Sequence, residues 1–280
     1  MSLLDTPPSP AASPEAALDA LRRELLDLKR VVVAFSGGVD SSLLAWVAAD
    51  TLGDQALAVT AVSPSLAERE RSDCRELADE WGMRWVEVET DEMLNAAYRV
   101  NDANRCFHCK DALMDQIGPL AEQAEATAVL GVNLDDLGDH RPGQQAAESR
   151  GAGFPLVAAG FDKALVREVS RLLELRTADK PAAACLASRL PYGTPVSLGI
   201  LRSVDRAEAN LVQLGFDSLR VRHYDDVARL EVPDDRLAEA VARRLEIIAA
   251  VKAAGYRYVT LDLEGLRSGN LNQALQTPDA

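Results

Sequence analysis

One short segment, residues 31–42, is the most informative part of the sequence. It reads Val31-Val32-Val33-Ala34-Phe35-Ser36-Gly37-Gly38-Val39-Asp40-Ser41-Ser42. Its first five residues form an apolar run, which is typical of a strand buried on both faces. Residues 41–52 then have the pattern of a helix. A glycine turn between a buried strand and a helix start predicts an anion site, because free backbone N–H groups and the helix dipole favour negative charge there.

The turn itself contains groups suited to phosphate. Gly37 and Gly38 let the backbone approach phosphate oxygens without a Cβ in between. Hydroxyl donors are available on Ser36, Ser41 and Ser42. A Walker loop would have a lysine after its glycines, and none is present here. Asp40 lies nearby instead, and a carboxylate among phosphates predicts a Mg²⁺ partner.

The rest of the first two thirds alternates between strand and helix patterns. Strands are expected at 57–62, 84–88, 128–132 and 156–157, and helices at 17–29, 66–81, 106–123, 142–150 and 163–175. This alternation predicts an α/β fold with a doubly wound, mostly parallel, Rossmann-like sheet covered on both faces. Such sheets bind ligands beyond the carboxyl ends of their strands.

A proline- and glycine-rich stretch over 181–195 predicts a linker. We therefore expect a first domain over 17–190 and a smaller C-terminal α+β domain over 191–280. In the second domain, helices are expected at 204–214 and 234–253, and strands at 219–223, 228–232 and 258–262. Residues 1–16, rich in Pro, Ser and Ala, predict a disordered tail.

Composition excludes several classes of protein. With 48% hydrophobic and 26% charged residues, the chain can bury a sizeable core. A formal charge of −14 argues against nucleic-acid binding, because an acidic surface repels phosphate backbones. No apolar run approaches the roughly 20 residues of a membrane span, and no targeting segment is visible. The expected location is the cytoplasm.

Four cysteines occur, and in a cytoplasmic chain metal binding or catalysis is a better expectation than disulfides. Cys106 and Cys109 form a CxxC, and Cys185 lies far along the chain. Three thiolates fit a [4Fe–4S] cluster with one open iron. They also fit a zinc site completed by His108 or water. In a third reading, Cys185 acts alone as sulfur donor or nucleophile, activated by nearby positive charge such as Lys180 and Arg189.

Polar residues elsewhere are further candidates. Those that follow the fourth expected strand are Asn133, Asp135, Asp136, Asp139 and Arg141. The carboxylates suit magnesium, and the arginine suits a phosphate or carboxylate. Arg220 and Arg222 alternate on a strand and share a face, which indicates an anionic ligand; pairing with Asp225 and Asp226 is the alternative. Glu208, on the preceding helix, is a weaker candidate.

These motifs together resemble the LarE family, a sulfur-transferring branch of the N-type ATP pyrophosphatase (PP-loop) group. The similar segments are Ser36–Ser42, Asn104–Lys110, Gly131–Gly143, Lys180–Arg189, Arg220–Val232 and Tyr258–Asn270. The resemblance implies an enzyme that adenylates a carboxylate of pyridinium-3,5-biscarboxylic acid mononucleotide with ATP and Mg²⁺, releasing pyrophosphate. Sulfur then displaces AMP and leaves a thiocarboxylate, a step towards the nickel-pincer nucleotide of lactate racemase.

The resemblance also implies residue roles. It assigns nucleotide or substrate binding to Ser36, Gly37, Gly38, Asp40, Ser41, Ser42, Asp135, Asp136, Arg141, Ser188, Arg189, Glu208, Arg220 and Arg222. Some members have only the cysteine matching Cys185 and give up its sulfur. Three-cysteine members are thought to hold a [4Fe–4S] cluster. Our hypothesis is therefore that Cys106, Cys109 and Cys185 hold a cluster whose open iron carries the transferred hydrosulfide, from an unidentified sulfide source. The resemblance also suggests a homo-oligomer such as a hexamer.

Three other functions are weighed against this one. A tRNA thiolase of the same group would need an RNA-binding surface, which the acidic charge opposes. An amide-forming ligase related to NAD or GMP synthetase would leave the three cysteines without a role. A non-enzymatic nucleotide-binding module with a zinc site would bind ATP without releasing pyrophosphate.

Overall fold

The computed structural model describes residues 13–138, 142–181 and 184–267, which form two compact units. The described residues of the first unit are 13–63, 70–92, 106–138 and 142–181, and those of the second are 64–69, 93–105 and 184–267. The second unit thus begins before the expected boundary at 190 and includes two short segments from the first half of the chain. Helix α1 (Pro14–Leu28) begins inside the expected tail, where Ser13 Oγ accepts a 3.2 Å hydrogen bond from Ala16 N. Residues 1–12 lie outside the described ranges.

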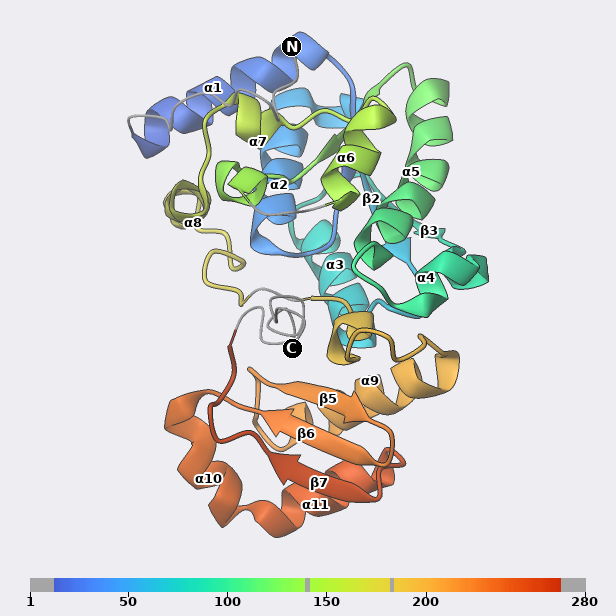
Figure 1. Ribbon diagram of the computed structural model, residues 1–280. Coiled ribbons are helices and arrows are strands. Elements are labelled where there is room, and N and C mark those ends of the chain that lie inside the picture. Colours follow the sequence, from blue (N-terminus) through green and yellow to red (C-terminus); the bar gives the residue numbers. More distant parts are fainter. Residues whose placement is uncertain (1–12, 139–141, 182–183, 268–280) are drawn as a thin grey trace. The chain divides into compact units, whose positions relative to one another are not determined.

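The first unit is built on a four-stranded parallel sheet (Figure 1). Its strands are β1 (Val31–Ala34), β2 (Ala56–Val62), β3 (Trp85–Glu89) and β4 (Thr127–Leu130), in the order β3-β2-β1-β4. The predicted α/β class is confirmed. Because β2 and β4 lie on opposite sides of β1, the order of strands switches direction between β1 and β4. In such sheets this switch point is where ligands bind.

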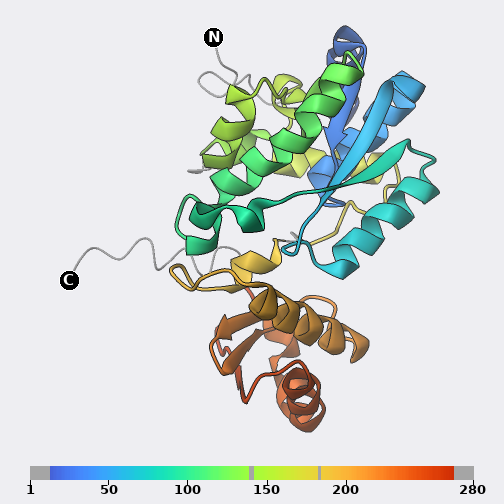
Figure 2. The ribbon, with the colours of Figure 1, turned by 90° about the vertical axis from the view of Figure 1, so that its right-hand side faces the viewer.

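Helices cover both faces of this sheet, as the apolar run at its centre requires. Val31 and Val33 pack into one core, and Val32, which points to the other face, packs into a second. The first core also contains side chains of α1, α2 (Val39–Leu52), α3 (Glu68–Glu80) and α8 (Lys163–Leu172). The second contains side chains of α5 (Arg105–Gln123) and α6 (Pro142–Ser149). Figure 2 shows α3 and α5 on opposite sides of the sheet.

One expected strand is wrong. Residues 156–157 lie in a short helix, α7 (Pro155–Ala158), which begins with proline, a residue suited to the first helical position. The edge of β4 instead pairs with Gly153, whose N–H donates to Ala128 O at 2.8 Å. Two apolar residues alone do not distinguish a strand from a helix turn.

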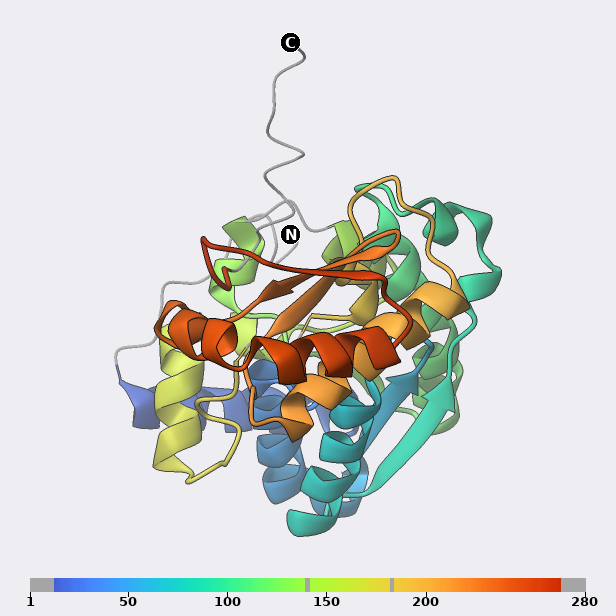
Figure 3. The ribbon, with the colours of Figure 1, turned by 90° about the horizontal axis from the view of Figure 1, so that it is seen from below.

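The second unit has a three-stranded sheet of mixed direction. Its elements are α4 (Ala96–Val100), α9 (Leu198–Gln213), β5 (Arg220–Tyr224), β6 (Val227–Glu231), α10 (Leu237–Ala242), α11 (Arg244–Ala253) and β7 (Tyr258–Leu261). β6 is central, antiparallel to β5 and parallel to β7. Helices α9 and α11 pack side by side against one face (Figure 3). The single helix expected over 234–253 is interrupted at Arg243.

Short 3₁₀ turns connect several elements of both units. They are Gly53–Gln55, Glu92–Leu94, Leu134–Gly138, Leu186–Arg189 and Asp234–Arg236. Two of them follow regions singled out by their sequence, at the carboxyl end of β4 and directly after Cys185. Across the described ranges, no helix has the length and apolar character needed to cross a membrane.

Candidate active site

The glycine turn after β1 has the geometry of an anion cradle. Gly37 has φ +67°, a left-handed conformation that glycine adopts without steric cost. Gly38 is the N-cap of α2 and offers no side-chain cap, so the first N–H groups of the helix stay available. Ser41 Oγ shapes the turn by donating to Gly38 O at 3.1 Å and by lying 3.0 Å from Ser36 Oγ. The turn therefore presents backbone donors at the positive end of a 14-residue helix.

The predicted serines differ in their exposure. Ser36 is exposed, whereas Ser41 and Ser42 are buried. Ser42 donates its backbone N–H to Gly38 O at 2.9 Å, and its Oγ has no hydrogen-bond partner within the described part of the chain. Ser42 thus lies in the helix base behind the cradle, while Ser36 lies on its surface.

The switch point brings the loop after β4 against the start of α2. A Cβ added to Gly131 would lie only 2.8 Å from Ser41 N and 2.9 Å from the carbonyl carbon of Asp40. Just beyond, Asn133 Nδ2 donates to Asp40 Oδ1 at 2.9 Å. The two loops are therefore in backbone contact, as the strand order demands.

Asp40 is the centre of a polar group at this edge. Its second carboxylate oxygen, Oδ2, accepts a hydrogen bond from Lys163 Nζ, at the start of α8. Asp135 Oδ2 accepts the backbone N–H of the same lysine at 2.8 Å. Asp136 Oδ2 accepts Asn133 N at 3.2 Å. The structure thus brings the predicted Asp40, Asp135 and Asp136 into one network, while Arg141 and Asp139 lie outside the described residues.

The cysteines occupy three different environments. None of the four forms a disulfide. Cys106 and Cys109 lie in the first turn of α5 in the first unit, three residues apart and hence on one face of the helix. Cys185 is exposed in the second unit, directly before the turn Leu186–Arg189. Cys74 is fully buried in the first core, and burial raises the pKa of its thiol to about 11, with a hydrogen bond to Thr60 opposing the shift.

Helical geometry argues against His108 as a partner of Cys106 in a zinc site. Residues two apart on a helix do not face each other, and the His108 ring makes an edge contact with Phe107 instead, at 5.6 Å between centroids. Within the described ranges, no three His, Cys, Asp or Glu side chains are grouped to hold a metal ion.

A buried arginine network surrounds the backbone of Cys185 in the second unit. Arg189 makes a two-pronged ion pair with Glu208, at 2.8 and 3.0 Å. Its Nη1 donates to Ala184 O at 2.7 Å and lies 3.4 Å from Cys185 O. Arg189 therefore fixes the chain at Cys185 and places a positive charge beside it. Glu208 Oε1 also accepts Val221 N at 2.9 Å, which ties this pair to β5.

Arg220 and Arg222 do share one face of β5, but their partners differ. Arg222 is buried, pairs with Glu231 at 2.9 and 3.0 Å, and donates to Ser188 O at 2.8 Å. The alternative pairing with Asp225 and Asp226 is therefore wrong for Arg222. Its carboxylate comes from the facing strand, β6.

Arg220, by contrast, has no carboxylate within ion-pair distance in the described part of the chain; its Nη1 donates to Arg267 O at 2.9 Å. Burial, together with repulsion from Arg222 and Arg189, lowers the pKa of its guanidinium. With Arg229 and Asp262, which join the same network, four arginines face three carboxylates, and Arg220 is the arginine of this described network without a paired carboxylate. This is a favourable place for an anion.

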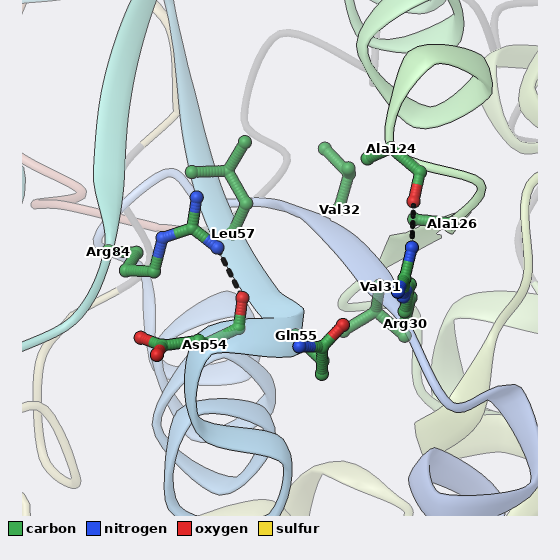
Figure 4. Close-up of a pocket in the computed structure, with 9 residues that line it drawn as sticks. All are labelled: Arg30, Val31, Val32, Asp54, Gln55, Leu57, Arg84, Ala124 and Ala126. Atoms are coloured by element: carbon green, nitrogen blue, oxygen red, sulfur yellow. Dashed lines mark hydrogen bonds between the residues drawn. The ribbon is translucent and has the colours of Figure 1, made fainter.

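A cavity lies at the opposite edge of the sheet (Figure 4). Its volume is about 550 Å³, and it lies at the amino ends of the parallel strands, opposite the glycine turn. The lining residues are Arg30, Val31, Val32, Asp54, Gln55, Leu57, Arg84, Ala124 and Ala126. Arg84 and Arg30 donate to the carbonyls of Asp54 and Ala124. Ligands of parallel sheets bind at the other edge, and none of the candidate residues lies here.

Several known proteins are similar to this chain. A family model described as NAD synthase matches residues 17–113, which contain the glycine turn, Cys106 and Cys109. An uncharacterised protein of Synechocystis sp. is 44% identical over 264 residues, 93% of this chain and 98% of that protein. An uncharacterised protein of Methanocaldococcus jannaschii is 26% identical over 247 residues, 88% of this chain and 94% of that protein.

The pyridinium-3,5-bisthiocarboxylic acid mononucleotide synthase of Lactiplantibacillus plantarum is 36% identical over 253 residues. The match covers 90% of this chain and 92% of that enzyme, and so includes both units. The chain belongs to the LarE family. The family predicted from the motifs is confirmed. The family model places residues 17–113, which include the glycine turn at 36–42, in the PP-loop superfamily, whose members use ATP.

Some residues of this LarE-family site had no clear sign in the sequence. Lys163 is 123 positions from Asp40, and no local motif marks it. Glu231 was not identified because a single glutamate at a strand end looks like a surface residue. In the register of β5 and β6, Glu231 lies opposite Arg220 and Arg229 lies opposite Arg222. This places the Glu231 carboxylate next to the arginines of β5, where it binds Arg222. The alternation of Arg229 and Glu231 on the facing strand was the sequence signal that could have indicated this role.

Proposed function

We propose that this protein adenylates a carboxylate of pyridinium-3,5-biscarboxylic acid mononucleotide and then converts it to a thiocarboxylate, in the biosynthesis of the nickel-pincer nucleotide. The observation that carries the proposal is the similarity to the L. plantarum synthase along nearly the whole of both chains. The anion cradle at the sheet's switch point supports it independently, because it suits the phosphates of ATP.

In the first step, a carboxylate oxygen attacks the α-phosphorus of ATP, and the bond to the bridging oxygen breaks with its electron pair leaving on pyrophosphate. The backbone N–H groups at Gly37–Gly38 and the hydroxyl of Ser36 bind the phosphates. Asp40 is the residue that would hold Mg²⁺, which would neutralise charge on the phosphates, and Asn133 fixes the orientation of the Asp40 carboxylate through the 2.9 Å hydrogen bond. The lysine that now bonds Asp40 indicates that this carboxylate can accept a cation partner.

The substrate is anionic, with two carboxylates and a phosphate, and Arg220 is the favoured partner for it. The buried pairs of Arg189 with Glu208 and of Arg222 with Glu231 keep this face rigid. Ser188, half-buried between them, adds a hydroxyl. In the second step a sulfur nucleophile attacks the acyl carbon, a C–S bond forms, and the C–O bond to AMP breaks.

Cys106, Cys109 and Cys185 are the candidates to hold a [4Fe–4S] cluster. Cys106 and Cys109, on one face of a helix turn, are the first two thiols of the proposed set, and the exposed Cys185 is the third. When bound, such a cluster with three protein ligands supplies an iron with an open position for exogenous sulfide. Arg189 would hold the Cys185 backbone in either role, as cluster ligand or as sulfur donor.

The direct test is to incubate the protein with Mg-ATP, the biscarboxylate mononucleotide and sulfide under anaerobic conditions. We expect substrate-dependent pyrophosphate release and a product heavier by the exchange of oxygen for sulfur. Arg220→Met should weaken substrate binding, while Arg257→Met, an exposed arginine of the same unit, should not. ATP binding without substrate-dependent pyrophosphate release would reject the proposal.

The cluster is tested by iron, sulfide and zinc analysis after anaerobic purification. About four irons per chain in the wild type, lost in Cys106→Ala but kept in Cys74→Ala, is the expected result. Zinc without iron would make Cys106 and Cys109 a structural site, and no metal would leave Cys185 as the donor.

We further propose that the protein is a cytoplasmic homo-oligomer. Exposed thiols suit a reducing compartment. Light scattering measures the number of chains in the assembly.

A further inference from the structure

A lysine from the end of the first unit lies beside the ATP-binding loop. The loop itself has no lysine between Ser36 and Ser42. Lys180 Nζ lies 3.7 Å from the place where a Cβ on Gly37 would be. Because Gly37 has no side chain, nothing of its own separates its backbone from this ammonium group.

Lys180 is held at both ends. Its Nζ donates to Glu70 Oε2 and to Asp73 Oδ2, each at 2.7 Å, and its side chain is only 12% exposed. Its backbone N–H donates to Thr177 O at 3.0 Å. Arg167, on α8, donates to the carbonyls of Ala178 and Lys180 at 2.6 and 3.1 Å. The ammonium group is therefore positioned with little freedom.

The charge of Lys180 is secure. Burial by itself disfavours the ammonium and is the largest single effect, but the hydrogen bonds and charges of Asp73 and Glu70 together outweigh it. The pKa of Lys180 thus lies above its ordinary value. An ammonium group has three N–H donors, and the two carboxylates occupy two of them.

We propose that Lys180 binds the β- and γ-phosphates of ATP at Gly37 and supplies the lysine that the loop lacks. This inference rests on the proposed function. As the bond between the α-phosphorus and the bridging oxygen breaks, the third N–H of Lys180 stabilises the negative charge that develops on pyrophosphate, and no proton needs to move.

The neighbouring carboxylates give the proposal a distinctive consequence. Glu70, Asp73 and Lys180 together have a net charge of −1. Without the lysine, two carboxylates would face the phosphates directly and repel them. A lysine with only a structural role would leave pyrophosphate affinity unchanged once the protein folds.

The test measures binding of pyrophosphate and AMP, each with Mg²⁺ at fixed ionic strength, by isothermal titration calorimetry. In Lys180→Met, pyrophosphate should bind about 10- to 100-fold more weakly, the usual effect of losing a hydrogen bond to a charged group. AMP affinity should stay within about twofold, because AMP lacks the β- and γ-phosphates. Lys180→Arg should restore part of the loss. The matched control is Lys252→Met, which removes the same charge from an exposed position on α11.

A folding defect is separated from a binding defect with a second variant. Glu70→Gln/Asp73→Asn/Lys180→Met removes all three charges and leaves no buried carboxylate unpaired; it should fold and still bind pyrophosphate at least about tenfold more weakly than the wild type. Wild-type pyrophosphate affinity in either variant would overturn the role of Lys180. Failure of the wild type itself to bind ATP or pyrophosphate would instead reject the proposed function.

Discussion

Asn133 donates a 2.9 Å hydrogen bond to the carboxylate of Asp40, and this bond joins the loop after β4 to the first turn of α2. The two residues are 93 positions apart in the sequence. Their contact is possible because β4 pairs directly with β1, so that both strands end at the same edge. The glycine turn at 36–42 is therefore supported from a neighbouring strand, and its geometry depends on how closely the two backbones approach.

That close approach makes Gly131 sensitive to substitution. In Gly131→Ala the new Cβ would lie 2.8–2.9 Å from backbone atoms of Asp40 and Ser41, which belong to a buried helix and cannot yield as a side chain could. We expect a loss of roughly 2 kcal/mol in unfolding free energy and weaker ATP binding, measured by urea denaturation and calorimetry. Gly199→Ala, in open space in the first turn of α9, is the control and should leave both unchanged or slightly stabilised. Equal stability of the two variants would contradict the close contact.

Glu231 is the buried centre of charge in the second unit. It is 0% exposed and accepts hydrogen bonds from both Arg222 and Arg229. Glu231→Gln leaves these guanidinium groups without their carboxylate, so we expect a loss of about 3 kcal/mol in unfolding free energy, seen as a lower urea midpoint. Glu239→Gln, which breaks exposed pairs with Arg236 and Arg243 on α10, should show no measurable shift. A smaller loss for Glu231→Gln than for Glu239→Gln would be inconsistent with this burial.

The four cysteines should react with alkylating agents in a defined order. In metal-free protein at pH 8, exposed Cys106 and Cys185 should be labelled first and the half-buried Cys109 more slowly. Cys74 is 0% exposed, and because burial raises the pKa of its thiol to about 11, little thiolate is present to react. Peptide mapping by mass spectrometry measures the order, and all four should react in guanidinium chloride. Labelling of Cys74 as fast as Cys106 in native protein would disagree with the structure.

His223 predicts a specific dependence of stability on pH. Burial lowers the pKa of its imidazole below the ordinary value of 6.5, with Asp225 opposing, and Nδ1 lies 3.2 Å from Tyr256 Oη. As pH falls below 6.5, the unfolded chain takes up this proton first, so stability is lost between 6.5 and the lower pKa of the folded state. His223→Phe should flatten the pH dependence of Tm in this window. An unchanged slope in His223→Phe would mean that His223 is not the titrating group.

Sequence patterns identified those parts of the fold whose signal is local. The buried run Val31–Phe35 and the glycine turn marked the first strand and the helix after it, and the alternation of strand and helix patterns along the next hundred residues predicted the α/β sheet. The predicted ends of helices were wrong where a single side chain determines them. Helix α9 begins six residues before the expected Val204 because Ser197 Oγ accepts the N–H of Ile200. The sequence did not indicate the two lysines beside the glycine turn, because tertiary structure alone brings Lys163 to Asp40 and Lys180 to Gly37.

The two compact units are interleaved along the chain, with breaks at 63/64, 69/70, 92/93 and 105/106 before the last one near 184. Helix α4 is built from the first half of the gene, yet Val196 N donates to Arg99 O and Asn101 Nδ2 to Pro191 O inside the second unit. A single recombination event therefore cannot replace one unit with that of another protein without also removing part of the other unit. The two units are therefore expected to be inherited together. Protein split into two halves should fold and regain activity only when both fragments are present.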